Sequence, residues 1–373
     1  MLVDQLQLAG FRSYAALDVS FPPGPQLIVG PNAAGKTNLL EAIALLGSGR
    51  SHRASADTEL IAWPSDFARL EAQVRDDSGS ANRLELILAR AGSGARKRIR
   101  VNGVPRRASA LTASLPLVLF APEDMLLVIG SPGLRRSAVD GLINQLQPAA
   151  AASTFSTYSR ALTQRNNLLR AIRDGQAERA ELAYWDAVVC SEGGRIVEWR
   201  LHLLEQLAEP LAEAHAEIAP GEGRLGLDYV TNSAALPTET PARALARRLA
   251  ETSEKELWNG ATLVGPHRDD FRFELAGREM AGAASRGQQR SAILAYKLAE
   301  LELLRARDGR QPLLLLDDVF SELDPQRRAH LVRRIGELPQ AFVSTTTLDD
   351  LDAALVAAST AWRVSPGQLQ RAA

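Results

Sequence analysis

A glycine-rich loop near the amino terminus is the segment best suited to chemistry. The pattern Gly30-x4-Gly35-Lys36-Thr37 follows a short apolar run, 26–29, and precedes apolar residues at helical spacing. In this strand, loop and helix order, N–H groups at the helix start converge on phosphate oxygens, and the lysine adds a point charge. The hydroxyl of Thr37 suits Mg²⁺. The predicted ligands of a nucleoside triphosphate are Gly30, Pro31, Asn32, Ala33, Ala34, Gly35, Lys36 and Thr37.

An acidic pair after a run of leucines is the second candidate constellation. Leu313 to Leu316 predicts a buried strand, and Asp317 and Asp318 follow at its carboxyl end, where open α/β sheets bind ligands. Asp317 suits Mg²⁺, and Asp318 suits the group that orients or deprotonates an attacking water. An acidic pair alone is more often a solvated turn, but beside a phosphate loop it predicts the second half of one site. Lys36 and Asp318 are therefore the predicted catalytic residues.

A third pattern opens a long helix with the residues Ser285-Arg286-Gly287-Gln288-Gln289-Arg290. A serine and glycine at the amino end of a helix offer N–H groups to an anion. The same serine is also an ordinary helix cap. The pattern therefore predicts either a second phosphate contact or a structural cap.

The elements that position these residues fall into two kinds. Up to about residue 120 the alternation of apolar and polar residues predicts strands, with Asn102-Gly103 as a hairpin turn. From Pro132 to about Pro220 the pattern is helical, and a further helix is expected from Arg286 to about Arg307. We therefore divide the chain into a lobe of residues 1–125 and 308–373, which holds the loop and the acidic pair, and a mainly helical lobe of residues 126–307.

Composition excludes several classes of protein. The chain has 373 residues, of which 46% are apolar and 23% charged, so two or three folded units are expected rather than a disordered or fibrous chain. No apolar run approaches the roughly 20 residues that cross a bilayer. Cys190 is the only cysteine, which rules out an intrachain disulfide and fits a reducing compartment. We expect a cytoplasmic protein without a membrane partner.

The net charge of −1 gives no general attraction for nucleic acid, so any DNA contact must come from local basic patches. Each patch alone is typical of a solvated surface. The candidates are Arg96-Lys97-Arg98 with Arg100, Arg106-Arg107, Arg135-Arg136, and Arg243 with Arg247-Arg248.

Taken together, these patterns resemble the ABC-type ATPases. The segment at Ser285 is similar to their signature motif, and Ser321-Glu322-Leu323-Asp324 is similar to their D-loop. The resemblance implies an α/β fold: an ATPase head with a phosphate-loop core, an antiparallel β layer and a helical second lobe. It also implies that ATP and Mg²⁺ are bound in a head-to-tail homodimer, where Ser285, Gly287 and Gln288 contact the ATP held by the other subunit.

Within that superfamily the chain resembles the RecF family, which is related to the SMC-type heads. The resemblance runs through most of the chain. It rests on the residues 8–14, 30–37, 49–53, 120–124, 133–136 and, most specifically, Gly265-Pro266-His267-Arg268-Asp269-Asp270. It implies an ATP-dependent dimer on duplex DNA and at single-strand gap junctions, which acts with RecR and helps RecA to load during DNA repair, replication and the SOS response.

Two departures from the ABC pattern predict a weak, DNA-stimulated ATPase. The histidine that follows the D-loop in transporters is replaced by the hydroxyl residues 344–347, so a γ-phosphate contact there would come from a hydroxyl. The usual catalytic glutamate is Asp318, which is one methylene shorter and suggests slow hydrolysis that acts as a timer. The glutamine switch loop has two candidate positions, Gln73 and the turn 120–124.

Two other functions share these motifs. The nucleotide-binding subunit of an ABC transporter is the main alternative, but the missing histidine and the long helical lobe count against it. An SMC-type head would need sustained heptads, and Pro148, Pro210 and Pro220 bound the helical stretch too closely for that.

Overall fold

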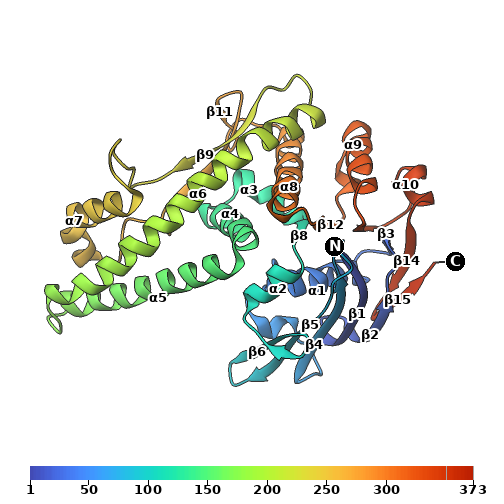
Figure 1. Cartoon of the computed structure of the whole chain (residues 1–373), viewed down its shortest axis with the longest axis horizontal. Coiled ribbons are helices and arrows are strands. Elements are labelled where there is room, and N and C mark those ends of the chain that lie inside the picture. Colours follow the sequence, from blue (N-terminus) through green and yellow to red (C-terminus); the bar gives the residue numbers. More distant parts are fainter. Residues whose placement is uncertain (350, 373) are drawn as a thin grey trace. The chain divides into compact units, whose positions relative to one another are not determined.

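The computed structural model describes residues 1–349 and 351–372 and divides into two compact units (Figure 1). Unit 1 comprises Met1–Met125, Pro210–Gly223 and Ser285–Ala373, and unit 2 comprises Leu126–Glu209 and Arg224–Ala284. The predicted boundary after residue 125 agrees with this division. Helix α8 (Arg286–Asp308) differs from the prediction, because it packs against strand β8 (Leu117–Phe120) and therefore belongs to unit 1.

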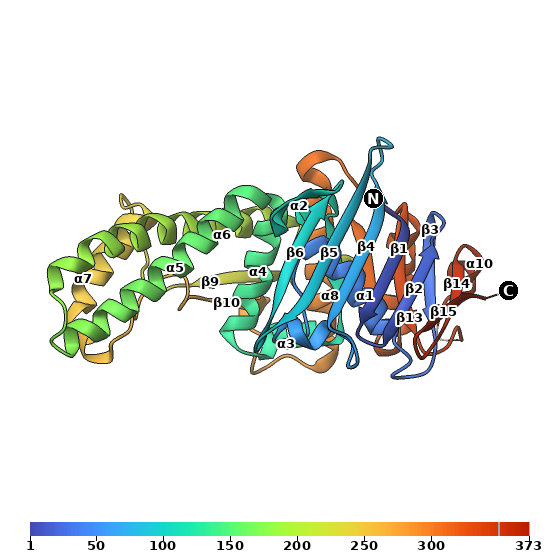
Figure 2. The same ribbon diagram turned by 90° about the horizontal axis from the view of Figure 1, so that it is seen from below.

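The first sheet of unit 1 is antiparallel throughout, with the strand order β2-β1-β4-β5-β6-β7 (Figure 2). The Asn102-Gly103 turn joins β6 to β7 with both φ angles positive, at 53° and 77°, which confirms the predicted hairpin. The strand bounds are β1 Leu2–Phe11, β2 Tyr14–Ser20, β4 Phe67–Arg75, β5 Ala81–Ala91, β6 Gly94–Val101 and β7 Val104–Pro105.

The second sheet of unit 1 has the order β15-β14-β3-β13-β12-β8, and β14, β3, β13, β12 and β8 run parallel. Every residue of β12 and β13 is buried, as the continuous apolar run at 313–316 predicted. The bounds of its remaining strands are β3 Gly24–Val29, β12 Leu313–Asp317, β13 Gln340–Thr345, β14 Thr360–Ser365 and β15 Gln368–Arg371.

Helix α1 (Lys36–Ser48) contacts strands of both sheets, including β4 and β12, and fills the core of unit 1. Its apolar side chains, such as Leu39 and Ile43, are buried in one cluster with side chains of the two sheets. This position fixes the amino end of α1 at the edge of the second sheet. The other helical segments of unit 1 are η1 Asp57–Leu60, α2 Ala108–Ser114, η2 Pro122–Met125, η4 Phe320–Glu322, α9 Pro325–Gly336 and α10 Ala353–Ala357.

Unit 2 is mainly helical, as predicted, with a small antiparallel sheet of order β11-β10-β9. Its core joins α5, α6 and α7 through residues such as Tyr158, Ile196 and Leu249. Helix α6 spans Leu182–Ile218, and its last turns belong to unit 1. The other elements are α3 Leu126–Ile129, α4 Pro132–Leu146, α5 Pro148–Arg173, η3 Arg179–Glu181, β9 Leu225–Val230, α7 Pro241–Asn259, β10 Asp270–Leu275 and β11 Arg278–Glu279. The α/β fold class is thus confirmed.

Candidate functional site

The glycine-rich loop is a tight connection between β3 and α1 that only small residues fit. Gly35 caps α1 with a φ of 111°, which favours glycine. A Cβ atom at Gly30 would lie 2.6 Å from the carbonyl oxygen of Val364. The buried hydroxyl of Tyr14 donates a hydrogen bond to the Gly35 carbonyl at 3.0 Å, and burial raises its pKa to about 12. The loop is therefore held by its surroundings in one shape, with its N–H groups at the helix start.

The ammonium group of Lys36 is folded back over the loop. Its side chain is 6% exposed, and Nζ donates to the carbonyl oxygens of Gly30 at 2.7 Å and Pro31 at 3.1 Å. Burial lowers the pKa of Lys36, while the nearby carboxylates of Asp318 and Asp317 oppose that shift. The cation therefore lies close to both the loop and the acidic pair, where phosphate oxygens could replace the two carbonyl acceptors.

The acidic pair ends β12 in two different environments. Asp317 is 3% exposed, and its Oδ1 accepts a hydrogen bond of 2.6 Å from the hydroxyl of Ser344. Asp318 leaves the strand with a φ of 53°, a left-handed conformation that is uncommon for a residue with a side chain. Its N–H donates to the same Ser344 oxygen at 2.9 Å.

The loop and the acidic pair lie at one edge of the second sheet. Strand β13 lies between β3 and β12, in parallel register with both, so the carboxyl ends of the three strands coincide. The N–H of Gly30 donates to the carbonyl of Thr345 at 3.3 Å, which joins the loop to the end of β13. The structure thus brings together the first two of the three predicted constellations.

The third constellation caps its own helix. Ser285 Oγ accepts from the N–H of Gln288 at 3.2 Å, and Gln288 Oε1 accepts from the N–H of Ser285 at 2.9 Å, which forms a capping box at the start of α8. Among the described residues, no hydrogen bond or ion pair joins Ser285, Gly287 or Gln288 to the loop 30–37. Ser285 is exposed, so the amino end of α8 is accessible to solvent.

The two candidate switch-loop positions differ in their relation to the acidic pair. Gln73 is exposed on β4, where its amide donates to the side-chain oxygen of Gln5 at 3.1 Å. The turn 120–124 follows β8, the neighbour of β12, and residues of this turn line a small hollow with Asp317, Asp318 and Arg290. Of the two candidate positions, the turn 120–124 is therefore the one that lies beside the acidic pair.

Polar contacts connect α8 to the turn 120–124 and to α9 in unit 1. Lys297 is buried within 3.3 Å of the carboxylates of Asp124 and Glu300; burial opposes its charge, but the two carboxylates raise its pKa. Arg327 of α9, which follows the segment similar to a D-loop, donates from Nε to Ser291 Oγ at 2.9 Å. The helix that begins at Ser285 is thus fixed to the turn at 124 and to α9.

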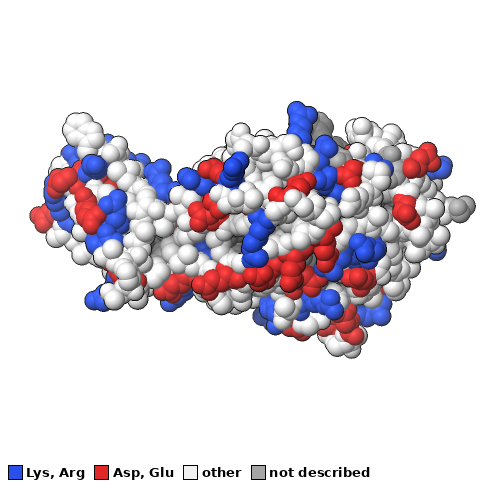
Figure 3. All heavy atoms as spheres, turned by 90° about the horizontal axis from the view of Figure 1, so that it is seen from above, with Lys and Arg blue, Asp and Glu red and all other residues white. Residues whose placement is uncertain are grey.

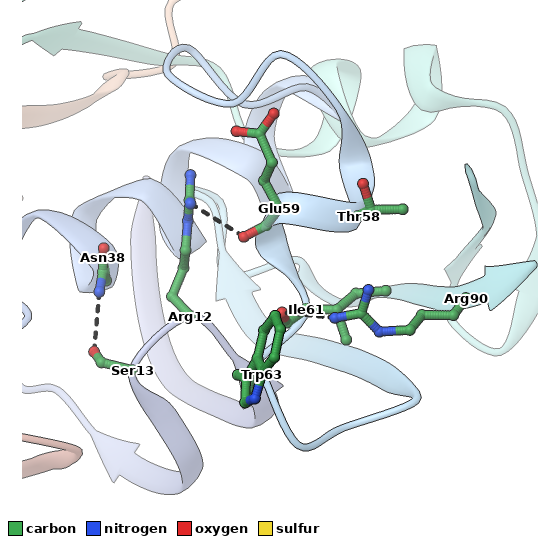
Figure 4. A pocket seen from close by; sticks show the side chains of 9 residues that line it. Arg12, Ser13, Asn38, Thr58, Glu59, Ile61, Trp63 and Arg90 are labelled. Carbon is green, nitrogen blue, oxygen red and sulfur yellow. Dashed lines mark hydrogen bonds between the residues drawn. The ribbon is translucent and has the colours of Figure 1, made fainter. Parts of the chain in front are cut away.

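Sequence reasoning missed a cavity of about 520 Å³ beside the first turn of α1 (Figure 4). Arg12 lies on one side, with Nη1 bonded to the Glu59 carbonyl at 3.1 Å, and Asn38 donates to Ser13 at 2.9 Å. The ring of Trp63 is 95% exposed at the same cavity. An exposed aromatic ring beside cations and hydroxyl groups can hold a nucleoside next to the phosphate loop. Four separate segments of the chain line the cavity, and the sequence patterns indicated only one of them, through the string 8–14.

The predicted basic patches have different environments. Arg135 makes a bidentate contact with Asp270 at 2.8 and 2.9 Å, so it is a structural residue of unit 2. Lys97 turns to the inner face of its sheet and pairs with Asp57 at 2.9 Å. Arg136 bonds a backbone carbonyl, and Arg247 and Arg248 pair with acidic residues of unit 2, whereas Arg243 is exposed. The remaining exposed arginines, which form no ion pair with a described residue, are Arg96, Arg98, Arg106 and Arg107.

The segment Gly265–Asp270 holds unit 2 together. A Cβ at Gly265, where φ is 122°, would lie 2.8 Å from the hydroxyl of Tyr158. That hydroxyl bonds His267 Nδ1 at 2.7 Å, and burial lowers the pKa of His267 to about 4, so the ring is neutral. Arg200 donates to the Pro266 carbonyl at 2.8 Å. The most family-specific string is therefore structural in this unit.

Comparisons with known proteins show the family of this chain. The family model described as the RecF/RecN/SMC N terminal domain matches residues 2–364. The DNA replication and repair protein RecF of Chloroflexus aurantiacus is 42% identical over 392 residues, which cover 99% of each protein. The protein of that name from Limosilactobacillus fermentum is 39% identical over 376 residues, with 100% of this chain and 99% of the relative covered.

Solved structures give the same picture. The recombination mediator protein RecF of the RecFOR pathway, in a structure with ATP, superposes with a TM-score of 0.91 at 29% identity over 100% of this chain and 97% of the other. An Smc head bound to a domain of ScpA has a TM-score of 0.54 at 16% identity over 100% and 97% of the two chains, which shows a shared fold. No helix within the described part of the chain has the length and apolar character needed to span a bilayer.

Proposed function

Because this chain belongs to the RecF family of DNA replication and repair proteins, we propose that it is an ATPase that dimerises when it binds ATP and that binds DNA as this dimer. The observation that carries the proposal is the meeting of the phosphate loop and the acidic pair at one sheet edge, with Lys36 between them. The transporter alternative is not favoured, because the relatives that match over the full length are repair proteins.

The residues present fit ATP and Mg²⁺. We assign the phosphates to the N–H groups of residues 30–37 and to Lys36. The ammonium of Lys36 donates to two carbonyl oxygens, which phosphate oxygens can replace as acceptors. Thr37 and Asp317 would bind Mg²⁺, which in such sites commonly uses one or two side chains together with waters and phosphates. Bound ATP supplies the γ-phosphoryl bond that is hydrolysed.

Asp318 is the proposed water-orienting group. Burial lowers the pKa of the Lys36 ammonium, and Asp318 lies close enough to oppose that shift; it also lines the hollow that Arg290 lines. Its carboxylate can accept a proton from a water aligned with the γ-phosphate. Because it is shorter than the usual glutamate, we propose slow turnover that times the dimer.

The Asp318→Asn variant tests this role. The amide keeps the shape of the side chain and loses its basicity, so we expect ATP binding to remain and hydrolysis to fall by on the order of 10²-fold. Single-turnover hydrolysis and fluorescent-ATP titration measure the two effects. Asp228→Asn, at an exposed position of β9, is the matched control and should hydrolyse ATP at the wild-type rate. An unchanged rate in Asp318→Asn would show that another group orients the water.

A head-to-tail homodimer would use the exposed start of α8. Ser285 and the N–H groups of the first turn are accessible to an anion, and within the chain they do not bond to residues 30–37. We propose that Ser285, Gly287 and Gln288 contact the γ-phosphate held by the partner subunit's phosphate loop. Each of the two ATP sites would then be complete only in the dimer.

DNA contacts are proposed on the outer face of β6. Arg96, Arg98 and Arg100 alternate along this strand with inward-facing residues, which spaces the guanidinium groups by roughly 6.8 Å. Arg100 is partly neutralised by Glu85 at 3.3 Å, whereas Arg96 and Arg98 form no ion pair with a described residue. A row of cations with this spacing suits a phosphate backbone rather than base edges.

The double variant Arg96→Ser/Arg98→Ser tests this surface. If each arginine contacts one phosphate, the slope of log K against log salt should fall by about 1.8 for gapped duplex DNA. Fluorescence anisotropy at several salt concentrations measures the slope. Arg179→Ser/Arg224→Ser also removes two exposed arginines, each of which pairs with a glutamate, and should leave the slope unchanged. Equal slopes in the two double variants would exclude the β6 surface.

The finer cellular role rests on family membership. The solved relative is named for the RecFOR pathway, and this supports a role with RecR in helping RecA to load at single-strand gaps. We place this activity in the cytoplasm, because the proposed substrate is the chromosome.

A further inference from the structure

Ser344 is a buried serine that contacts both carboxylate residues of the site. It lies on β13 directly beside Asp317 in the parallel register and is fully buried. Its Oγ donates to Asp317 Oδ1 at 2.6 Å and accepts from the N–H of Asp318 at 2.9 Å. One hydroxyl therefore bonds the side chain of the first aspartate and the backbone of the second.

These two hydrogen bonds limit the further contacts that the Ser344 hydroxyl can make. A serine hydroxyl has a single proton, and here that proton is donated to Asp317. The neighbouring hydroxyl of Thr345 is donated to the Thr347 carbonyl at 2.8 Å. The sequence pattern predicted that a hydroxyl in 344–347 would replace the γ-phosphate contact of the missing histidine, and Ser344 is not available for that contact in this arrangement.

The backbone of Asp318 shows why the second bond matters. Its left-handed φ of 53° is disfavoured for a residue with a Cβ and must be held by its surroundings. The Ser344 oxygen accepts the N–H of this strained residue, and Ser321 donates to the Asp318 carbonyl at 2.9 Å. A serine therefore bonds the peptide group on each side of Asp318. These two bonds hold the turn that places the Asp318 carboxylate after the end of β12.

We propose that Ser344 is a positioning residue that sets the Asp317 carboxylate for Mg²⁺ and holds the Asp318 turn. The inference rests on the proposed function, because it assigns Mg²⁺ to Asp317. Hydrogen bonds to metal ligands orient them, and removal of such a partner commonly weakens metal affinity by about 10- to 100-fold. Without its donor, the Asp317 side chain loses the contact that fixes its rotamer inside a fully buried strand.

The test is a Mg²⁺ titration of fluorescent-ATP binding, with binding in EDTA as the baseline. For Ser344→Ala we expect the Mg²⁺ midpoint to rise by about 10- to 100-fold, while nucleotide affinity in EDTA stays at the wild-type value. Ser344→Cys keeps a side chain of similar volume with a weak hydrogen-bond donor, so its Mg²⁺ midpoint should lie between those of the wild-type protein and Ser344→Ala. This variant provides the test if Ser344→Ala does not fold. Thr345→Val is the matched control, because it removes the adjacent buried hydroxyl, which contacts neither aspartate.

The outcomes separate this inference from the proposed function. A shift in the two Ser344 variants but not in Thr345→Val would support the positioning role. Wild-type Mg²⁺ midpoints in both Ser344 variants would overturn it, and so would an equal shift in Thr345→Val. Either result would leave the proposed function intact, because the wild-type protein would still bind ATP. If the wild-type protein itself showed no Mg²⁺-dependent nucleotide binding, the proposed function and this inference would both fail.

Discussion

The Lys36→Ala variant should bind ATP at least on the order of 100-fold more weakly than the wild-type protein. Lys36 is the only side-chain cation that the loop 30–37 supplies, and hydrogen bonds to charged groups contribute about 1.5–3 kcal/mol each. Its ammonium now bonds carbonyl oxygens of the same loop, and alanine leaves those oxygens to water. Titration with fluorescent ATP and fluorescent ADP measures the loss, which should be smaller for ADP because the γ-phosphate is absent.

Lys255→Ala is the matched control for this prediction. Lys255 is exposed on α7 of the other unit, so its removal takes away the same charge without touching the site. Nucleotide affinity in that variant should equal that of the wild-type protein. Wild-type ATP affinity in Lys36→Ala would mean that the loop is not the phosphate site.

The Ser285→Arg variant should lose ATP-dependent dimerisation and hydrolysis while each monomer still binds ATP. A bulky side chain at the exposed start of α8 would block the approach of the γ-phosphate held by the partner subunit's loop. The phosphate loop of the same chain has no hydrogen bond to Ser285 and should be intact. Light scattering with Mg²⁺ and ATP, together with ATP titration, measures the two properties separately.

Loss of the helix cap alone must be distinguished from this steric block. Replacing a capping serine commonly costs about 1 kcal/mol, whereas asparagine caps a helix as well as serine does. Ser285→Asn therefore keeps the cap with a small side chain, and we expect it to dimerise.

A mixture of Ser285→Arg and Lys36→Ala proteins contains heterodimers with one site built from intact parts. Recovered hydrolysis on mixing would support the trans arrangement, and normal hydrolysis by Ser285→Arg alone would show that Ser285 is only a cap.

The parts of the site that sequence predicted are those that local pattern determines. The loop 30–37, the strand at 313–317 and the helix from Arg286 each depend on spacing within one short segment, and all three form as expected. The sequence placed Arg96, Lys97 and Arg98 in one basic patch, but the structure shows that Lys97 pairs with Asp57 whereas Arg96 and Arg98 are exposed.

The parts that sequence missed depend on contacts between distant segments. Strand β14 lies parallel to β3 although more than 300 positions separate Thr360 from Gln26, and a local pattern carries no such information. The cavity at Trp63 combines four segments, and the hydrogen bonds of Ser344 require β13 to lie beside β12. Helix α8 was assigned to the helical lobe by its composition, and its contact with β8 places it in unit 1.

The most direct test of the central claim is the mass of the Asp318→Asn protein in solution with and without Mg²⁺ and ATP. This variant should retain bound ATP, so a complex that requires ATP in both sites will accumulate. We predict the mass of one chain, 40.3 kDa, without nucleotide and twice that mass with it, and no doubling when Ser285→Arg is added to the same chain. A mass that stays at one chain while fluorescent ATP is seen to bind would contradict the account.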